Sequence, residues 1–176
     1  PMPYYMASIE AMDYQIGKLL EGIPDDELDN TIIIFIGDNG TPGQVVQTYA
    51  TRRAKGSVYQ GGVNVPMIIA GKDVTRINQT EDALISTTDL FATISNIAGI
   101  NTTTINDSQS FAALLTSSNF TNSREYVYTE IEGDIASDYT IRNANHKYIL
   151  FEDGTEALFN LSINPLENPD LLSTNQ

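Results

Sequence analysis

Two short runs of apolar residues constrain the fold most, because both are short for a helix and rich in β-branched side chains. Residues 31–36 read TIIIFI and residues 65–70 read VPMIIA. Continuous apolar runs of this length are typical of strands that are buried on both faces, as in a parallel sheet. Pro66 indicates either an edge strand or the first residues of a strand. The two runs therefore predict two parallel strands within a parallel or mixed sheet of an α/β domain with flanking helices.

Helices are predicted on either side of these strands. Apolar side chains recur at steps of three and four residues before Gly22 and Pro24, which predicts an amphipathic helix that ends there; they are Ile9, Met12, Ile16, Leu19 and Leu20. A second helix begins at Thr88 or Asp89, which are both good N-cap residues, and ends at Gly99. The stretch DSQSFAALL, residues 107–115, predicts a further short helix.

The pattern changes beyond residue 123. The segments YVYTE, DYTIRN, HKYILFED and EALFNLS are short, aromatic and roughly alternating, which predicts antiparallel strands. We therefore divide the chain into an α/β part, residues 1–123, and a small antiparallel β subdomain, residues 124–176. Two strands do not complete a doubly wound sheet. We expect the missing strands to come from residues upstream of Pro1 or from another chain, so the 176 residues are interpreted as a fragment.

Composition excludes several classes of protein. The chain has 9 basic and 23 acidic residues and a net charge of -14, so nucleic acid is not an expected partner. It has no cysteine, which excludes disulfides, zinc thiolates and a thiol nucleophile. No apolar run approaches the roughly 20 residues that cross a bilayer, so no membrane partner is expected. The start of the chain also lacks the features of a signal peptide.

Polar residues follow the first predicted strand directly. Asp38 and Asn39 lie where open α/β sheets bind ligands, at the carboxyl end of a strand. One carboxylate and one amide suit a hard cation, Ca²⁺ or Mg²⁺, better than zinc. Gly40 and Gly43 allow the backbone to turn tightly there. The alternative is a simple turn, because Asp, Asn and Gly are all turn residues.

A basic cluster follows in this acidic chain. Arg52 and Arg53 are interpreted as solvated loop residues. Lys55 differs, because Gly56 and the pair Gly61 and Gly62 lie close to it in the sequence. A lysine in a glycine-rich loop beside a cation suits a tetrahedral dianion.

These segments together resemble the sulfatases of the alkaline phosphatase superfamily, specifically their C-terminal portion. DNTIIIFIGDNG is similar to the family's metal motif, an apolar run that ends in (S/T)DNG. AKGSVYQGGVNVPMII resembles the segment K-x-x-x-YEGG-x-x-VP. Four more segments match the family in the same order: YYMASIEAMDYQIGKLL, TDLFATISNIAGI, DSQSFAALL and RNANHKYILFEDGTEALFNLSINPLENPDL.

The resemblance implies roles for three residues. Asp38 and Asn39 would be two ligands of a single divalent cation, Ca²⁺ or Mg²⁺. Lys55 would be catalytic and substrate-binding, contacting the sulfate ester and stabilising charge on the leaving oxygen. The family's nucleophile is a formylglycine within a (C/S)-x-P-x-R motif, which this chain lacks. We therefore expect the chain to be inactive alone.

The resemblance has departures and leaves alternatives open. Gly37, Gln60 and Ala92 replace a Ser or Thr, a Glu and a Pro of the family pattern. A phosphodiesterase or phosphonate hydrolase of the same superfamily is the second hypothesis, and a non-catalytic binding module is the third. His146, the single histidine, is predicted to be a surface or structural residue, with a weaker prediction of substrate binding. A sheet without its neighbouring strands also predicts self-association through an open edge.

Overall fold

The computed structural model describes residues 1–100, 106–117, 119, 124–132 and 137–173. The chain separates into two compact units, residues 1–74 and residues 75–176. Each unit is described by itself below. This boundary after residue 74 differs from the division after residue 123 that the sequence pattern predicted, and that division stays a prediction. Among the described helices, none combines the length and apolar character that a membrane crossing needs.

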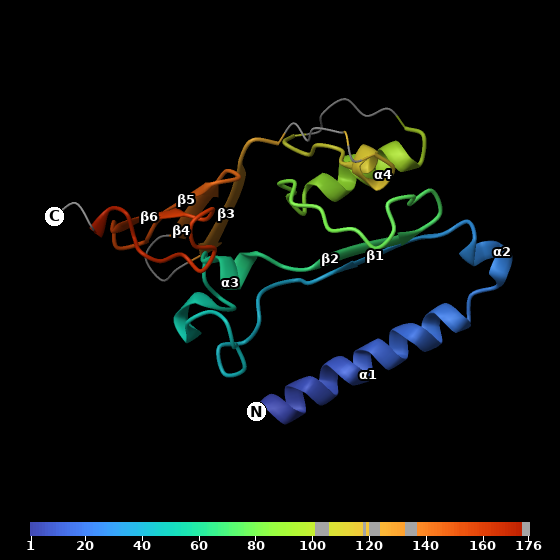
Figure 1. Ribbon diagram of the computed structural model, residues 1–176, viewed down its shortest axis with the longest axis horizontal. Coiled ribbons are helices and arrows are strands. Elements are labelled where there is room, and N and C mark those ends of the chain that lie inside the picture. Colours follow the sequence, from blue (N-terminus) through green and yellow to red (C-terminus); the bar gives the residue numbers. More distant parts are fainter. Residues whose placement is uncertain (101–105, 118, 120–123, 133–136, 174–176) are drawn as a thin grey trace. The chain divides into compact units, whose positions relative to one another are not determined.

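The first unit begins with a long helix, α1 (Met2–Glu21), followed by the single turn α2 (Asp25–Leu28). Pro3 lies in the first turn of α1, where its missing N–H costs nothing, and Gly22 caps the other end. This confirms the predicted helix and its end, whereas Ile9, Met12 and Leu19 of the predicted apolar face are exposed. No residue of α1 is buried, although the helix runs beside the two strands of the same unit (Figure 1).

Strands β1 (Ile32–Ile36) and β2 (Met67–Gly71) form a two-stranded sheet. They pair antiparallel, with Ile32 opposite Gly71 and Ile36 opposite Met67, so the expectation that these two strands run parallel to each other is wrong, whereas an antiparallel pair fits the mixed form of the predicted sheet. The chain leaves β1 and returns at the same end of that strand, whereas a parallel partner needs a crossover to the opposite end. The connection contains only the 3-10 turn η1 (Thr51–Arg53) and the one-turn helix α3 (Gln60–Val63).

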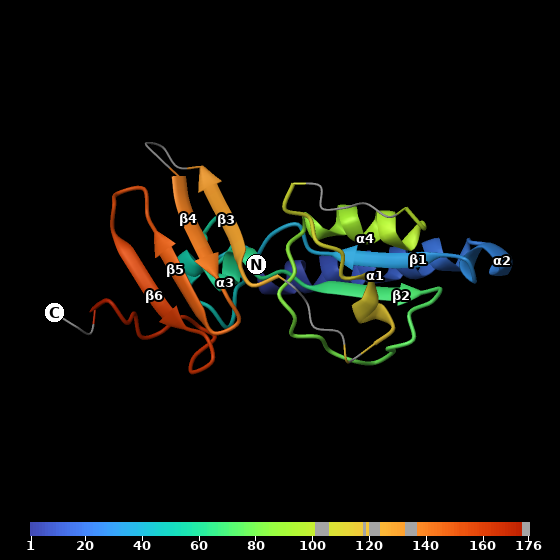
Figure 2. The same ribbon diagram turned by 90° about the horizontal axis from the view of Figure 1, so that it is seen from above.

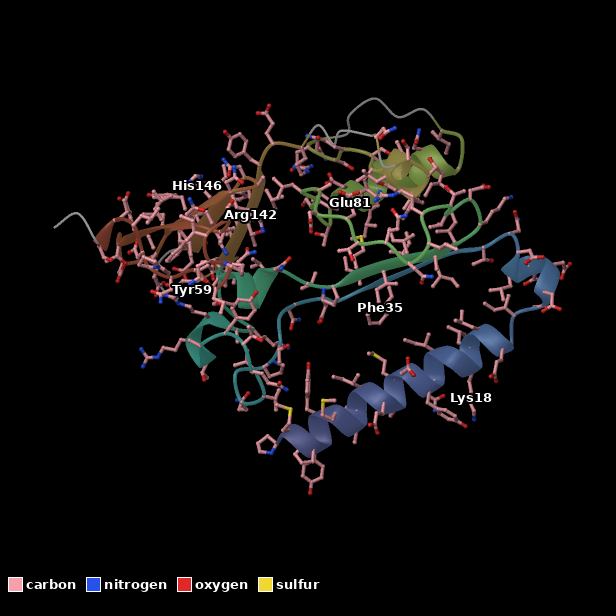
Figure 3. The ribbon with its side chains drawn as sticks, viewed as in Figure 1. Lys18, Phe35, Tyr59, Glu81, Arg142 and His146 are labelled. Carbon is pink, nitrogen blue, oxygen red and sulfur yellow. The ribbon has the colours of Figure 1, made fainter. Side chains whose placement is uncertain are left out.

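The burial of these strands also differs from the prediction. All five residues of β1 are half-buried, and β2 alternates between half-buried and exposed residues. Phe35 points from β1 to the side on which α1 lies (Figure 3). Half-burial along β1 and the exposed residues of β2 show that, among the described residues, neither strand is buried on both faces as the apolar runs predicted.

The second unit contains helix α4 (Asp89–Ile97) and the 3-10 turn η2 (Ala112–Leu115). The predicted helix after Thr88 is confirmed, whereas the short helix predicted within residues 107–115 is a 3-10 turn. Thr93 of α4 is buried, and its hydroxyl accepts a hydrogen bond from the backbone N–H of Phe111 at 3.0 Å. Phe111 and Leu114 are also buried, so the turn and the helix share a small core.

The C-terminal residues form a four-stranded antiparallel sheet, as predicted (Figure 2). Its strands follow chain order: β3 (Val127–Glu132), β4 (Ser137–Arg142), β5 (His146–Leu150) and β6 (Glu156–Asn160). One face, which we call the inner face, carries the buried side chains Thr140, Lys147, Ile149, Ala157 and Phe159. The opposite, outer face carries the stacked rings of Tyr128 and Tyr139, which are both exposed. The chain is therefore α/β with antiparallel sheets.

Candidate functional site

The loop after β1 is held to two later segments by backbone hydrogen bonds. The N–H of Gly37 donates to the carbonyl oxygen of Pro66 at 3.0 Å, and the N–H of Gly40 donates to that of Gly62 at 2.9 Å. The N–H of Lys55 donates to the carbonyl oxygen of Thr41 at 3.0 Å. The loop containing Asp38 and Asn39 therefore lies against the segment containing Lys55.

Glycines make this approach possible. A Cβ atom on Gly40 would lie 1.9 Å from the carbonyl oxygen of Gly61, and one on Gly62 would lie 2.0 Å from that of Ser57. Both distances are far inside van der Waals contact, and the obstacles are backbone atoms that cannot rotate away. The DNG and QGG sequences are therefore two halves of one packed backbone arrangement.

The side chains at this place match a hard-cation site only in part. Asp38 is exposed, Asn39 is half-buried, and Lys55 is exposed. Both Asp38 and Asn39 offer oxygen, which is what Ca²⁺ and Mg²⁺ bind. The described residues contain no group of three or more His, Cys, Asp or Glu side chains that could hold a metal. The donor set thus fits such an ion chemically but supplies two of the six or more ligands that it takes.

Neighbouring residues of the loop are partly ordered by side-chain contacts. Arg52 is exposed, as expected of a solvated residue. Arg53 is half-buried, and its guanidinium lies 4.5 Å from the centre of the Tyr59 ring, a cation–π contact. The prediction that Arg53 is only a solvated loop residue is therefore wrong. Gln60, which replaces the family's glutamate, is buried at the start of α3.

Comparison with known proteins places this arrangement in a family. The family model described as Sulfatase matches residues 1–100, which include both glycine-rich segments. The chain belongs to the sulfatase family. Arylsulfatase K of Mus musculus is 26% identical over 176 residues, an alignment that covers 93% of this chain and 31% of the relative.

Solved structures agree with the family. The structure of a 2-O GAG sulfatase matches with a TM-score of 0.66 and 27% identity, covering 81% of this chain and 32% of the other. A phosphonate monoester hydrolase from Silicibacter pomeroyi shares the fold, with a TM-score of 0.68, 20% identity, and coverage of 86% and 33%. The chain thus spans about a third of the length of these relatives.

The other candidates from the sequence are not parts of this loop pair. His146 is exposed at the start of β5 in the second unit (Figure 3), so its proposed contact with substrate stays a prediction. Asp89 does stabilise the start of a helix, because its Oδ2 accepts a hydrogen bond from the N–H of Ser86 at 2.8 Å.

Asp89 also belongs to a buried ion pair that the sequence did not reveal. The Nε and Nη2 atoms of Arg124 donate to the two carboxylate oxygens of Asp89 at 2.8 and 2.5 Å. Arg124 also donates to the carbonyl oxygen of Asp107 at 2.5 Å, which connects α4 to the segment before Ser108. No sequence signal pointed to Arg124, because it lies 35 positions from its partner in a polar stretch.

A second buried ion pair joins the C-terminal sheet to the segment that follows it. The Nζ atom of Lys147 lies 2.8 Å from Oε1 of Glu167, and both side chains are fully buried. The last segment that matches the family, RNANHKYILFEDGTEALFNLSINPLENPDL, contains both residues, but the match gave no indication that they pair. Both residues are charged and buried, and neither belongs to the loop that contains Asp38 and Asn39.

An open groove of about 560 Å³ in the second unit has the wrong charge for a sulfate ester. Its walls include Glu81, Asp82 and Glu125, and its one basic wall residue, Arg124, is already paired with Asp89. Carboxylates repel an anionic group. The loop pair around Asp38 and Lys55 is therefore the better candidate site.

Proposed function

We propose that this chain contributes part of the metal site and the sulfate-binding lysine of a metal-dependent sulfuric ester hydrolase. The proposal rests on the backbone hydrogen bonds and close glycine contacts that hold the DNG loop against the Lys55 segment, in a chain of the sulfatase family. We call this arrangement the backbone lock. These contacts bring together the segments of the oxygen donors and the lysine, although Asp38 and Asn39 lie 17 and 16 positions before Lys55. The rest of the site, including the formylglycine nucleophile, belongs to residues outside these 176.

Each residue has a role in this proposal. Asp38 and Asn39 hold one divalent cation, Ca²⁺ or Mg²⁺, through side-chain oxygens. A divalent cation at such a site polarises the sulfuryl oxygens of the ester. Lys55 presents a compact positive charge on a mobile stem, which suits an oxygen whose charge grows as the ester bond breaks. His146 is proposed only as a weak contact to the substrate.

The first test is Ca²⁺ binding by the 176-residue chain, followed through its amide resonances. We expect Ca²⁺ to shift the amides of residues 38–40, and Asp38→Asn to abolish these shifts. Asp29→Asn is the matched control, because Asp29 is an exposed carboxylate that precedes β1 instead of following it. Equal shifts in the acidic turn at residues 25–29 would show unspecific binding and overturn the metal assignment.

The same pure chain should not hydrolyse an aryl sulfate, because it holds no nucleophile motif. Turnover that survives Lys55→Ala would contradict both the inactivity and the role of the lysine.

A second candidate function is phosphonate ester hydrolysis, which the shared fold of the Silicibacter pomeroyi enzyme favours. Sulfate monoesters carry one negative charge, and phosphonate monoesters also carry one, so the loop pair alone does not distinguish them. The comparison is kcat/KM for matched aryl sulfate and aryl phosphonate esters in a protein that joins this chain to a nucleophile segment. Preference for the phosphonate would replace the sulfatase proposal.

A non-catalytic binding module is the remaining alternative, and the same joined protein tests it. Turnover of neither ester, with Ca²⁺ still bound at Asp38, would favour that alternative.

A further inference from the structure

Two cations lie directly opposite each other on the inner face of the C-terminal sheet. Arg142 of β4 pairs with Lys147 of β5 in the strand register, so their side chains project from the same face as neighbours. Like charges in this relation destabilise a sheet. A negatively charged group near Arg142 and Lys147 is therefore needed to offset their repulsion.

Only one carboxylate is assigned to the two cations. Glu167 forms the ion pair with Lys147 and acts on Arg142 through its field. Burial lowers the pKa of Lys147 to about 8, and the charge of Arg142 pushes that pKa in the same direction. Burial also lowers the pKa of Arg142, against the opposing effect of Glu167. The three groups together retain one excess positive charge, in a chain whose net charge is -14.

Arg142 differs from the other arginines of the second unit. Arg76 forms an ion pair with Glu81, and Arg124 forms one with Asp89, but no ion pair among the described residues includes Arg142. Its Nε atom donates to the carbonyl oxygen of Asn143 at 3.2 Å, which orients the guanidinium plane. The side chain is half-buried at the end of β4, so its remaining donors are partly desolvated without being sealed from solvent.

We propose that the Arg142 guanidinium is an anion subsite that binds one sulfate or carboxylate group of an anionic ligand. An oriented, partly desolvated guanidinium matches the planar edge of two oxygens on such a group. The excess charge of the Arg142, Lys147 and Glu167 cluster supplies the attraction. Anion binding at Arg142 does not depend on the proposed function.

The test is a titration of the 176-residue chain with sodium sulfate, with sodium chloride keeping the ionic strength constant. Nitrogen-15 resonances of the arginine side chains and the amides of Arg142 and Lys147 report binding. We expect saturable shifts at Arg142 and these amides. We also expect the pKa of Lys147, measured at its Cε resonance, to rise, because the bound anion offsets the charge of Arg142.

Variants separate this subsite from unspecific binding. Arg142→Gln should weaken sulfate binding by at least about tenfold, because charge-assisted hydrogen bonds are lost. Arg142→Lys keeps the positive charge but lacks the planar set of N–H donors. Its sulfate affinity should lie between those of the wild type and Arg142→Gln. Arg52→Gln is the matched control, since Arg52 is an exposed arginine elsewhere in the chain, and it should leave the binding unchanged.

Three results would overturn the proposal. One is an equal response to chloride, and another is equal sulfate affinity in the wild type and Arg142→Gln. The third is the absence of a sulfate-specific shift at Arg142 in the wild type, which would mean that Arg142 only offsets the charge of Glu167. This third result decides the question even if Arg142→Gln does not fold. The Ca²⁺ test at Asp38 uses other residues, so the proposed function and this subsite can fail separately.

Discussion

Gly40 and Gly62 determine how closely the two loops of the candidate site approach each other. At each position an added Cβ atom would meet a backbone carbonyl oxygen at 2.0 Å or less. The role of these glycines is therefore steric, and it explains why glycine stands beside the proposed metal ligands and the lysine. The sequence indicated Asp38, Asn39 and Lys55 as candidates because each lies within a short local motif.

Gly40→Ala should separate the two loops. We expect the free energy of unfolding to fall by about 1–3 kcal/mol, because the new methyl group overlaps the carbonyl group of Gly61. Urea unfolding measures the change. Gly17→Ala is the control, since no atom lies within 4 Å of its added Cβ and alanine should stabilise α1 by up to about 1 kcal/mol. A neutral Gly40→Ala would contradict the backbone lock.

Lys147 gives the stability an unusual dependence on pH. Its pKa is about 8 in the folded chain and 10.5 in the unfolded chain, so between these values the unfolded chain binds more protons. The free energy of unfolding should therefore rise from pH 8 to pH 10. Above about pH 10 it should fall, because the hydrogen bond to Glu130 raises the pKa of Tyr128 to about 12 and favours the neutral phenol in the folded chain.

Urea unfolding at closely spaced pH values measures this profile. The double variant Lys147→Met, Glu167→Leu removes the ion pair as a unit and should abolish the rise between pH 8 and pH 10. A wild-type profile that falls throughout this range would contradict the lowered pKa of Lys147.

At the scale of elements, local patterns predicted the helices α1 and α4 and the C-terminal strands but not how distant segments meet. The periodicity of α1 and the alternation in β3 to β6 are local properties. The apolar runs of β1 and β2 predicted strands but not whether the two strands run parallel or antiparallel. The pattern of apolar residues does not show at which end of β1 the chain returns to form β2. The Asp89–Arg124 and Lys147–Glu167 ion pairs escaped prediction for a related reason, since the partners lie 35 and 20 positions apart.

Asp89 connects α4 to the chain before β3, so its substitution should affect the second unit as a whole. Asp89→Asn leaves the charge of Arg124 buried without its countercharge, and we expect a loss of about 3–5 kcal/mol in the free energy of unfolding. Asp82→Asn is the control, because Asp82 is exposed and should change stability little. Equal stability of the two variants in urea would show that the pair contributes nothing.

At the scale of the whole molecule, the chain carries the candidate loop pair beside a two-stranded sheet. It spans about a third of the length of its relatives, and among the described residues β1 and β2 pair only with each other. A two-stranded sheet is marginal alone and leaves unpaired N–H and C=O groups along both outer edges. Among the described residues, β1 and β2 have no neighbouring strands at their outer edges. A second copy of the chain can provide such strands.

We therefore expect the chain to self-associate through the edges of β1 and β2. The average mass from light scattering should increase with concentration at an ionic strength of about 0.15 M, where the net charge is screened. Ile68→Lys places a charge on an exposed residue of β2 and should reduce the association. Ile77→Lys is the matched control, since Ile77 is 71% exposed, against 62% for Ile68, but lies outside the strands. A monomer at every concentration, or an equal effect of both lysines, would show that the edges do not pair.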